Sequence, residues 1–197
     1  LITGDWLALS PFLIVLCGAL VVLLLEAFSD VWSKRLASIV TLGTLLLSAY
    51  LAVIPFRSEN SLLISWLRFD WLAHFLAFIF AVIGIATTLL SQAFFKRFET
   101  SQGEFYFLLL SSIFGLQLIA YSADFLTLFI GLETLSISLY VLCGYMKRWQ
   151  ISHEAAMKYF LMGALAAAFL LYGIALIYGA IGSTSFATLA DGYHSLS

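Results

Sequence analysis

Charged residues are scarce in this sequence. Only 10% of the 197 residues are Asp, Glu, Lys or Arg, whereas 63% are hydrophobic and the mean hydropathy is +1.06. A soluble domain usually carries about 25% charged residues. The composition therefore excludes an ordinary soluble protein and indicates an integral membrane protein. The net charge of -2 adds little, since the charges are few and most of them fall between apolar runs.

Several signatures of other protein classes are absent. The sequence has no basic stripe of the kind that binds nucleic acid, and no motif typical of a nucleotide, haem, iron–sulfur or zinc site. Its two cysteines, Cys17 and Cys143, lie inside apolar runs, which favours buried packing residues over a disulfide or a metal site. The first apolar run is too long for a signal-peptide core, and no basic segment precedes it. We expect no nucleic-acid partner.

The apolar runs predict the fold. A membrane-spanning helix needs about 20 mainly apolar residues, and by that measure the sequence predicts an all-α, polytopic transmembrane bundle over residues 1–181. The six predicted helices cover residues 7–28, 36–54, 71–94, 105–121, 125–145 and 154–181. Residues 182–197 are polar and begin with a Gly-Ser turn signal, so we expect an extramembrane loop or a truncated tail there.

Basic residues mark alternate loops. Lys-Arg pairs follow the first, third and fifth predicted helices, at residues 34–35, 96–97 and 147–148, while the opposite side holds only Arg57 and Arg68. The positive-inside rule places the three pairs in the cytoplasm. We therefore expect a multi-pass protein of a bacterial inner membrane, with its N-terminus in the periplasm.

Glu133 lies in the middle of the 125–145 helix. At 1.5 Å per residue it is roughly 13 Å from the helix start, near the bilayer centre. An ionisable group at that depth costs roughly 2.5 kcal/mol or more, and such groups commonly mark ion or proton pathways. Ser136 and Tyr140 follow at helical spacing, so we expect a polar stripe that faces the bundle. The alternative is a protonated glutamate that only hydrogen-bonds to a neighbouring helix.

Lys158 lies four residues after Glu154, so the two side chains share one face of the 154–181 helix. Spacing alone leaves two interpretations open. Lys158 is either a functional lysine or a lysine that extends to the cytoplasmic surface and pairs with Glu154. His153, beside the loop, is a candidate for proton uptake, although a solvated loop histidine fits its position better.

Four more polar residues fall near or inside the helices. Asp70 and His74 form an i,i+4 pair at the outer end of the 71–94 helix, and we interpret both as interfacial. Glu26, near the inner end of the 7–28 helix, we assign to the cytoplasmic surface. Gln117, inside the 105–121 helix, is a candidate for a polar contact in the bundle interior.

Two linked motifs carry a family resemblance. The first, G-x-E-x-x-S-x-x-x-Y-V-L, covers residues 131–142, and the second, E-A-x-x-K-Y-F-x-x-G-A, covers residues 154–164. With the rest of the sequence from Glu104 onward, they closely resemble the N-terminal part of subunit N of bacterial complex I, the proton-translocating NADH–quinone oxidoreductase. The family also includes the counterparts of this subunit in mitochondria and chloroplasts.

The resemblance implies an antiporter-like bundle that moves protons through a line of buried ionisable residues. Glu133 matches the family's central channel glutamate, and Lys158 matches a functional lysine of subunit N. It further implies that NADH, FMN, iron–sulfur clusters and quinone belong to other subunits. The implied partners are the other membrane-arm subunits, the lipid bilayer and protons.

Members of that family continue through further helices with additional channel lysines. The sequence therefore corresponds either to an N-terminal fragment or to a split gene, and the main lysine partner of Glu133 is expected outside it. The expected function is proton translocation within an NADH–quinone oxidoreductase. Two alternatives stay open: a subunit of a multi-subunit cation/proton antiporter, and a purely structural membrane scaffold.

Overall fold

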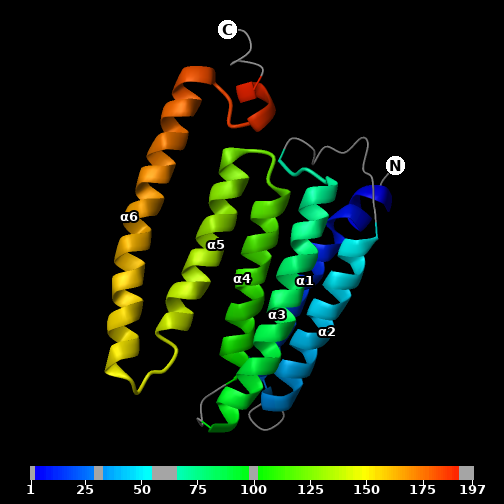
Figure 1. The fold of residues 1–197 in the computed structure, drawn as a ribbon, viewed down its shortest axis with the longest axis vertical. Coiled ribbons are helices and arrows are strands. Elements are labelled where there is room, and N and C mark those ends of the chain that lie inside the picture. Colours follow the sequence, from blue (N-terminus) through cyan, green and yellow to red (C-terminus); the bar gives the residue numbers. More distant parts are fainter. Residues whose placement is uncertain (1–2, 29–32, 55–65, 98–101, 191–197) are drawn as a thin grey trace.

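A computed structural model describes residues 3–28, 33–54, 66–97 and 102–190, without the side chains of residues 3–8 and 33–35. Six long helices account for most of these residues (Figure 1). They are α1 (Thr3–Phe28), α2 (Ser33–Val53), α3 (Trp71–Arg97), α4 (Gly103–Tyr121), α5 (Phe125–Cys143) and α6 (Gln150–Ile181). All six are long and apolar enough to cross a membrane. The prediction of an all-α, multi-pass bundle is confirmed.

The helices extend beyond the purely apolar runs at several ends. α1 begins at Thr3 rather than residue 7, α3 continues through Lys96 and Arg97, and α6 begins at Gln150 rather than residue 154. Hydropathy detects the part of a helix that lies in hydrocarbon, whereas polar and basic residues continue the helix into the interface. Basic residues in the last turn of α3 also interact favourably with the helix dipole.

α4 lies at the centre of the bundle and packs against α1, α2, α3 and α5 (Figure 1). One row of its side chains, Tyr106, Leu110, Gln117 and Tyr121, is fully buried. In the middle of the bundle this row meets apolar side chains of α1 and α2. That apolar layer consists of Val15, Leu45, Leu110 and Ile113.

α4 and α5 approach each other closely through two glycines. A Cβ atom at Gly115 would lie 2.7 Å from the backbone nitrogen of Leu135, and one at Gly131 would lie 3.0 Å from the backbone nitrogen of Ile119. Only glycine fits at such a contact, because a methyl group would meet backbone atoms that cannot turn away. Small residues of this kind drive helix packing in lipid, where apolar side chains gain nothing by leaving the solvent.

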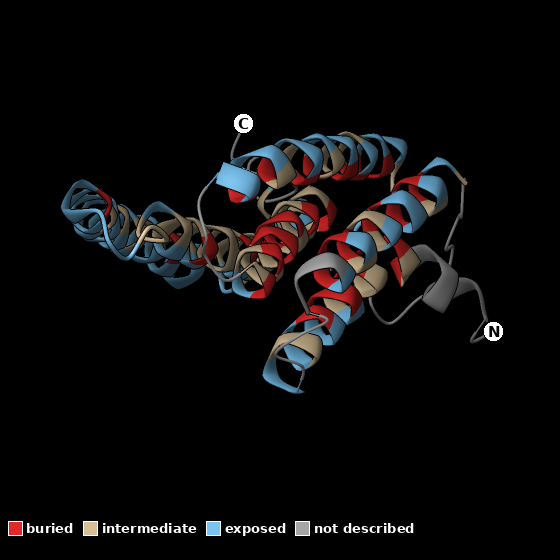
Figure 2. Cartoon of the chain, turned by 90° about the horizontal axis from the view of Figure 1, so that it is seen from below, coloured by how far each residue is buried: buried red, intermediate tan, exposed pale blue. Residues whose placement is uncertain are grey.

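α6 stands at the edge of the bundle and packs chiefly on α5. Figure 2, in which α6 lies at the left as in Figure 1, shows most of its surface as exposed. Gly163 lies against α5, since a Cβ atom there would overlap the hydroxyl of Tyr140. α6 ends at Gly182, which adopts the left-handed conformation (φ 76°) and donates its N–H to the Tyr178 carbonyl at 2.7 Å.

The turn between α4 and α5 is held by two distant segments. The N–H of Ala123 donates to the Trp66 carbonyl at 2.8 Å, and the N–H of Phe125 donates to the Thr184 carbonyl at 3.0 Å. The segments before α3 and after α6 are thereby joined at one end of the molecule. Residues 186–190 form a short helical turn where the sequence predicted a loop, and residues 191–197 lie outside the described part.

Cys17 and Cys143 are free, but the prediction that they are buried is wrong. Both side chains are exposed on the helix surface. A cysteine behaves as a small apolar residue, so in a membrane protein it is equally compatible with a lipid-facing position. An apolar run therefore does not distinguish the interior of the bundle from its lipid surface.

We predict that Gly115→Ala destabilises the bundle, because the new methyl group would meet the backbone of α5. Overpacking of this kind typically costs about 1–3 kcal/mol. Gly173→Ala in α6 is the matched control, since nothing lies within 4 Å of a Cβ atom there. Thermal unfolding in detergent should show a lower midpoint for Gly115→Ala and no decrease for Gly173→Ala; equal midpoints would contradict the close contact.

Candidate functional site

The local structure of α5 determines where Glu133 points. Asp124 caps the helix: its carboxylate accepts the N–H of Thr127 at 2.7 Å and the hydroxyl of Thr127 at 3.0 Å. Gly131 then faces α4. Glu133 follows two residues later, and at about 100° per residue it points some 200° away from Gly131. Glu133 is half-buried and lies on the face of α5 opposite to α4.

Tyr140, on the same face of α5 as Glu133, contacts α6. It lies seven residues after Glu133, which brings the two to within about 20° on the helix. Its ring packs edge-on against Tyr159 of α6, with centroids 4.8 Å apart, and against Phe160 at 5.7 Å. The stripe that begins at Glu133 therefore faces the α6 side of α5 rather than the core formed by α1–α4.

Lys158 lies on a different face of α6. It is five residues before Gly163, so it points about 140° away from the side that contacts α5. Its ammonium group is paired with Glu154, and the lysine side chain is 73% exposed. An exposed pair of this kind contributes little to stability, about 0–1 kcal/mol. Of the two open interpretations, the pairing with Glu154 is present in the structure.

Glu133 and Lys158 are also separated along the bundle. A Cβ atom at Gly144 would lie 3.1 Å from that of Ala156, which sets the level at which antiparallel α5 and α6 meet (Figure 1). From that level Glu133 is eleven residues away on α5 and Lys158 two residues away on α6. At 1.5 Å per residue they stand about 13 Å apart along the axis. They do not form one site within the described part of the chain.

His153 lines a shallow groove beside the α5–α6 contact, at the end of the bundle where α6 begins. The groove has a volume of about 300 Å³, and Tyr140, Val141 and Phe160 line it with His153. His153 is exposed, as expected for a residue near the loop. Tyr140 borders this groove and also belongs to the stripe of Glu133. The groove therefore lies at one end of the α5 face on which Glu133 stands, seven residues from Tyr140.

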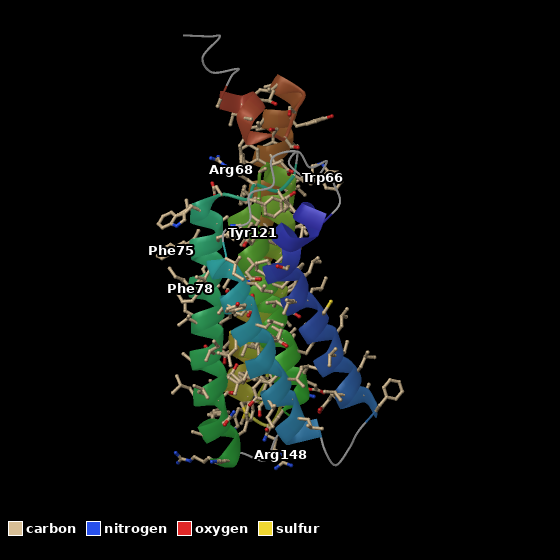
Figure 3. The ribbon with its side chains drawn as sticks, turned by 90° about the vertical axis from the view of Figure 1, so that its right-hand side faces the viewer. Trp66, Arg68, Phe75, Phe78, Tyr121 and Arg148 are labelled. Atoms are coloured by element: carbon tan, nitrogen blue, oxygen red, sulfur yellow. The ribbon has the colours of Figure 1, made fainter. Side chains whose placement is uncertain are left out.

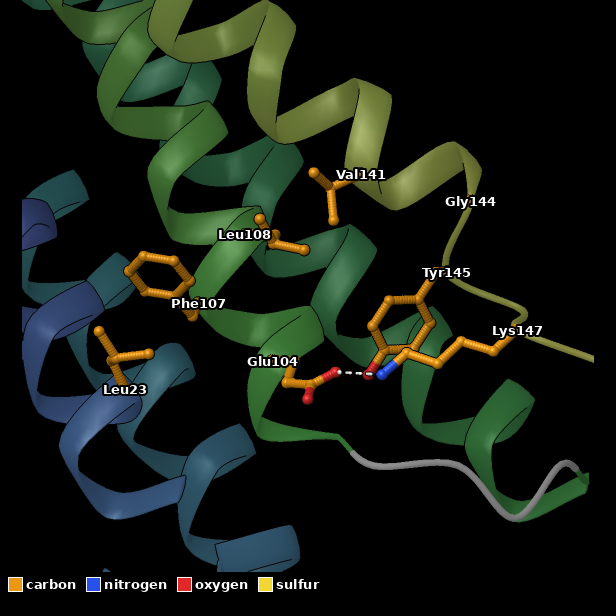
Figure 4. A pocket seen from close by; sticks show the side chains of 8 residues that line it. All are labelled: Leu23, Glu104, Phe107, Leu108, Val141, Gly144, Tyr145 and Lys147. Atoms are coloured by element: carbon orange, nitrogen blue, oxygen red, sulfur yellow. Dashed lines mark hydrogen bonds and ion pairs between the residues drawn. The ribbon is translucent and has the colours of Figure 1, made fainter. Parts of the chain in front are cut away.

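A second groove lies between α1, α4, the end of α5 and the segment after it, and Val141 borders both grooves. It has a volume of about 280 Å³, is mainly apolar, and carries an ion pair between Lys147 and Glu104 at 3.4 Å (Figure 4). The two partners are 43 residues apart. No sequence pattern indicated this pair, because the contact depends on how α4 and α5 cross.

Two of the polar residues near helix ends turn toward neighbouring helices. His74 is buried, and its ring is T-shaped to that of Tyr121 at 5.4 Å. Glu26 is half-buried, and one of its oxygens lies against the start of α4, where a Cβ atom at Gly103 would overlap it. The expectation for Gln117 is met: its amide nitrogen donates to Ser48 of α2 at 3.1 Å.

The described residues contain no group of three or more His, Cys, Asp or Glu side chains arranged to hold a metal ion. Gly131, which stands in the first motif, sets the packing of α5 on α4 and was not singled out from the sequence. Its spacing from Glu133 could have indicated this role, because residues two positions apart lie on nearly opposite faces of a helix.

Residues 122–196 match the family described as NADH:quinone oxidoreductase/Mrp antiporter, a transmembrane family. Over 98% of its length the chain is 53% identical to NADH-quinone oxidoreductase subunit N of Protochlamydia amoebophila, and over 95% it is 36% identical to that of Myxococcus xanthus. Over almost its whole length the chain is therefore similar to a partial stretch of proteins named NADH-quinone oxidoreductase subunit N. It spans only 40% and 36% of the lengths of these two relatives.

Chains of two solved respiratory complexes are also similar to this chain. A chain of respiratory complex I from Thermus thermophilus is 30% identical, with a TM-score of 0.72 over 89% of this chain and 38% of its own length. A chain of the membrane-bound sulfane sulfur reductase, an archaeal respiratory membrane complex, is 27% identical, with a TM-score of 0.78 over 93% of this chain. Both motifs that contain Glu133 and Lys158 fall inside the segment matched to the family.

Proposed function

We propose that this chain is a proton-translocating, membrane-arm subunit of an NADH-quinone oxidoreductase. The observation that carries the proposal is Glu133, the ninth of the 19 residues of α5. It lies in the family-matched segment of a chain 53% identical to a protein named subunit N. A carboxyl group in the middle of a spanning helix is costly and commonly marks a proton pathway.

In this proposal Glu133 takes up a proton and releases it again. The groove lined by His153 and Tyr140 supports uptake from the inner surface, because it joins an exposed imidazole to the face of Glu133. The drive is electrostatic: electron transfer elsewhere changes the charge of neighbouring subunits, and a nearby charge alters the proton affinity of a carboxyl group. Lys158, at the inner end of α6, is the second proposed participant.

We assign the redox chemistry to other subunits of the complex. NADH, FMN, iron–sulfur clusters and quinone would bind there, and this chain would contribute proton translocation alone. Its partners would be the other membrane-arm subunits and the lipid of a bacterial inner membrane. The structural neighbours support such a setting, since both belong to respiratory membrane complexes.

The second candidate function is that of a cation/proton antiporter subunit. The description of the matched family favours it as an alternative, because it names the Mrp antiporter beside the oxidoreductase. The names of the relatives favour the oxidoreductase. A structural scaffold without proton transfer is the third possibility, and substitutions at Glu133 distinguish it from the other two.

Glu133→Gln should reduce proton pumping about tenfold or more while the complex still assembles, because the amide keeps the size and hydrogen bonding of the acid but does not titrate. Glu133→Asp should retain part of the activity. The measurement is NADH-driven acidification of membrane vesicles, normalised to assembled complex on a native gel. Glu104→Gln is the matched control, since Glu104 is a half-exposed carboxylate at the end of the bundle. Wild-type pumping in Glu133→Gln would favour the scaffold.

Lys158→Ala should impair pumping more than Glu154→Ala. Lys158 lies one turn further into α6 than Glu154, so water replaces Glu154 more readily than it replaces the lysine. Neither change should affect assembly, because an exposed pair contributes little to stability. The same vesicle assay compares the two variants. Equal and mild losses would leave Lys158 as the surface partner of Glu154 and nothing more.

We further propose that the N-terminus is periplasmic. Arg148 and the basic end of α3 lie at one end of the bundle, opposite Trp66 and Arg68 (Figure 3). In a chain with Cys17 and Cys143 replaced by alanine, Thr188→Cys should react with a membrane-impermeant thiol reagent added outside, and Gln150→Cys should not. The reverse pattern would show that the orientation is inverted.

A further inference from the structure

Three polar atoms are buried without a hydrogen-bond partner among the described residues of α3 and α4. They are Nε2 of His74, Oε1 of Gln117 and the hydroxyl of Tyr121. Gln117 and Tyr121 are completely buried, and His74 is 8% exposed. Nearly all buried polar groups in proteins have a partner, and leaving one unpaired costs about 1–3 kcal/mol. Three such atoms together indicate a binding site for a polar ligand.

The direction of the Gln117 amide follows from its neighbours. Ser48 donates its hydroxyl to the Pro11 carbonyl at 2.8 Å, so its oxygen can accept a hydrogen bond but has no second proton to give. The group of Gln117 that lies 3.1 Å from this oxygen is therefore the donating nitrogen. Oε1 then points away from Ser48 as a free acceptor.

The tautomer of His74 follows in the same way. Nδ1 lies 3.0 Å from the carbonyl of Asp70, which only accepts, so Nδ1 carries the proton. In the neutral ring Nε2 is then an acceptor. The His74 and Tyr121 rings are T-shaped, with centroids 5.4 Å apart and an interplanar angle of 85°. His74 thus brings an unpaired acceptor into a ring pair with Tyr121.

Tyr121 completes the set. It lies one turn after Gln117 on the same face of α4, and a long side chain on a helix leans back toward the preceding turn. Its ring is enclosed by Phe12 at 6.0 Å and Phe69 at 5.6 Å. Its hydroxyl can both donate and accept a hydrogen bond. The cluster therefore offers two acceptors and one hydroxyl.

We propose that His74, Gln117 and Tyr121 bind an internal water molecule at the outer end of the α1–α4 core. Water has two protons and two lone pairs. It can donate to His74 Nε2 and Gln117 Oε1 and accept from the Tyr121 hydroxyl, which satisfies all three atoms. Buried waters typically make about three hydrogen bonds to otherwise unpaired polar groups. A neutral ligand fits, since the charged Asp70 points its carboxylate to Arg68 and the α3 N-terminus.

The site is not part of a path across the membrane. Toward the other end it is closed by the buried apolar layer of Val15, Leu45, Leu110 and Ile113. Further along α4, the buried hydroxyl of Ser112 donates to the Leu109 carbonyl at 2.7 Å, and that of Tyr106 has Ser91 as a partner at 3.3 Å. The site also lies on the opposite side of α4 from the Glu133 face of α5, so it is independent of the proposed proton transfer.

Hydroxyl-radical footprinting of the protein in its native membranes tests this directly, because X-ray radiolysis of a bound water produces radicals that oxidise the side chains around it. Tyr106 is the internal control: like Tyr121 it is fully buried and lies near one end of α4. Mass spectrometry should show Tyr121 oxidised several-fold faster than Tyr106, and Gln117→Leu should abolish the difference. Equal, slow oxidation of both tyrosines in the unsubstituted protein would overturn the proposal.

Tyr121→Phe gives a second test, which depends on whether the thermal midpoint rises or falls. If the hydroxyl binds water, removing it deprives the water of a partner and lowers the thermal midpoint. If the hydroxyl is dry and unpaired, its removal relieves a buried polar group and raises the midpoint. Tyr106→Phe, which loses the contact with Ser91, shows how large a decrease a paired buried hydroxyl produces. A raised or unchanged midpoint for Tyr121→Phe would contradict the bound water.

Discussion

The backbone contact between α4 and α5 is the constraint on which the rest of the arrangement depends. Gly115 and Gly131 bring the two helices so close that no side chain fits between them. In lipid, helices associate through close packing rather than through burial of apolar surface, so this contact fixes the rotation of α5. Once Gly131 faces α4, Glu133 must face away from it. The glycine of the first motif therefore determines the orientation of the acid: because Gly131 packs on α4, Glu133 faces the opposite side of α5.

The same constraint divides the molecule into two parts with different polar chemistry. On one side of α4, hydroxyl, amide and imidazole groups lie inside the α1–α4 core, where Gln117 bonds to Ser48 and Tyr106 to Ser91. On the other side, α5 presents Glu133 and Tyr140 toward α6. Within the first set, a buried apolar layer separates the pair of Gln117 and Ser48 from that of Tyr106 and Ser91, whereas in the second set Tyr140 borders an open groove with His153. Only the second arrangement suits proton movement.

Much of the fold could be predicted from the sequence, because spanning helices are recognised by length and hydropathy alone. Glu133 could be singled out for a similar reason, since a carboxylate in an apolar run is costly wherever it faces. The facing of each helix could not be predicted. Helices that are apolar all round have no polar stripe to show which side is buried, and so the cysteines were misplaced.

Contacts between side chains on different helices could not be predicted from the sequence either. The ion pair between Glu104 and Lys147 and the inward turn of His74 depend on how helices cross. Lys158 shows the intermediate case: spacing predicted that it shares a face with Glu154, and the structure pairs the two, yet spacing left its functional role open. Local periodicity specifies neighbours on one helix but not partners on another.

Infrared difference spectroscopy on the assembled, membrane-embedded complex tests the central claim most directly. If Glu133 carries the translocated proton, addition of NADH should change a protonated-carboxyl stretching band, and that change should be missing in Glu133→Gln but present in Glu104→Gln. An identical difference spectrum in the unsubstituted protein and in Glu133→Gln, with both complexes oxidising NADH, would show that Glu133 does not change protonation and would contradict the account.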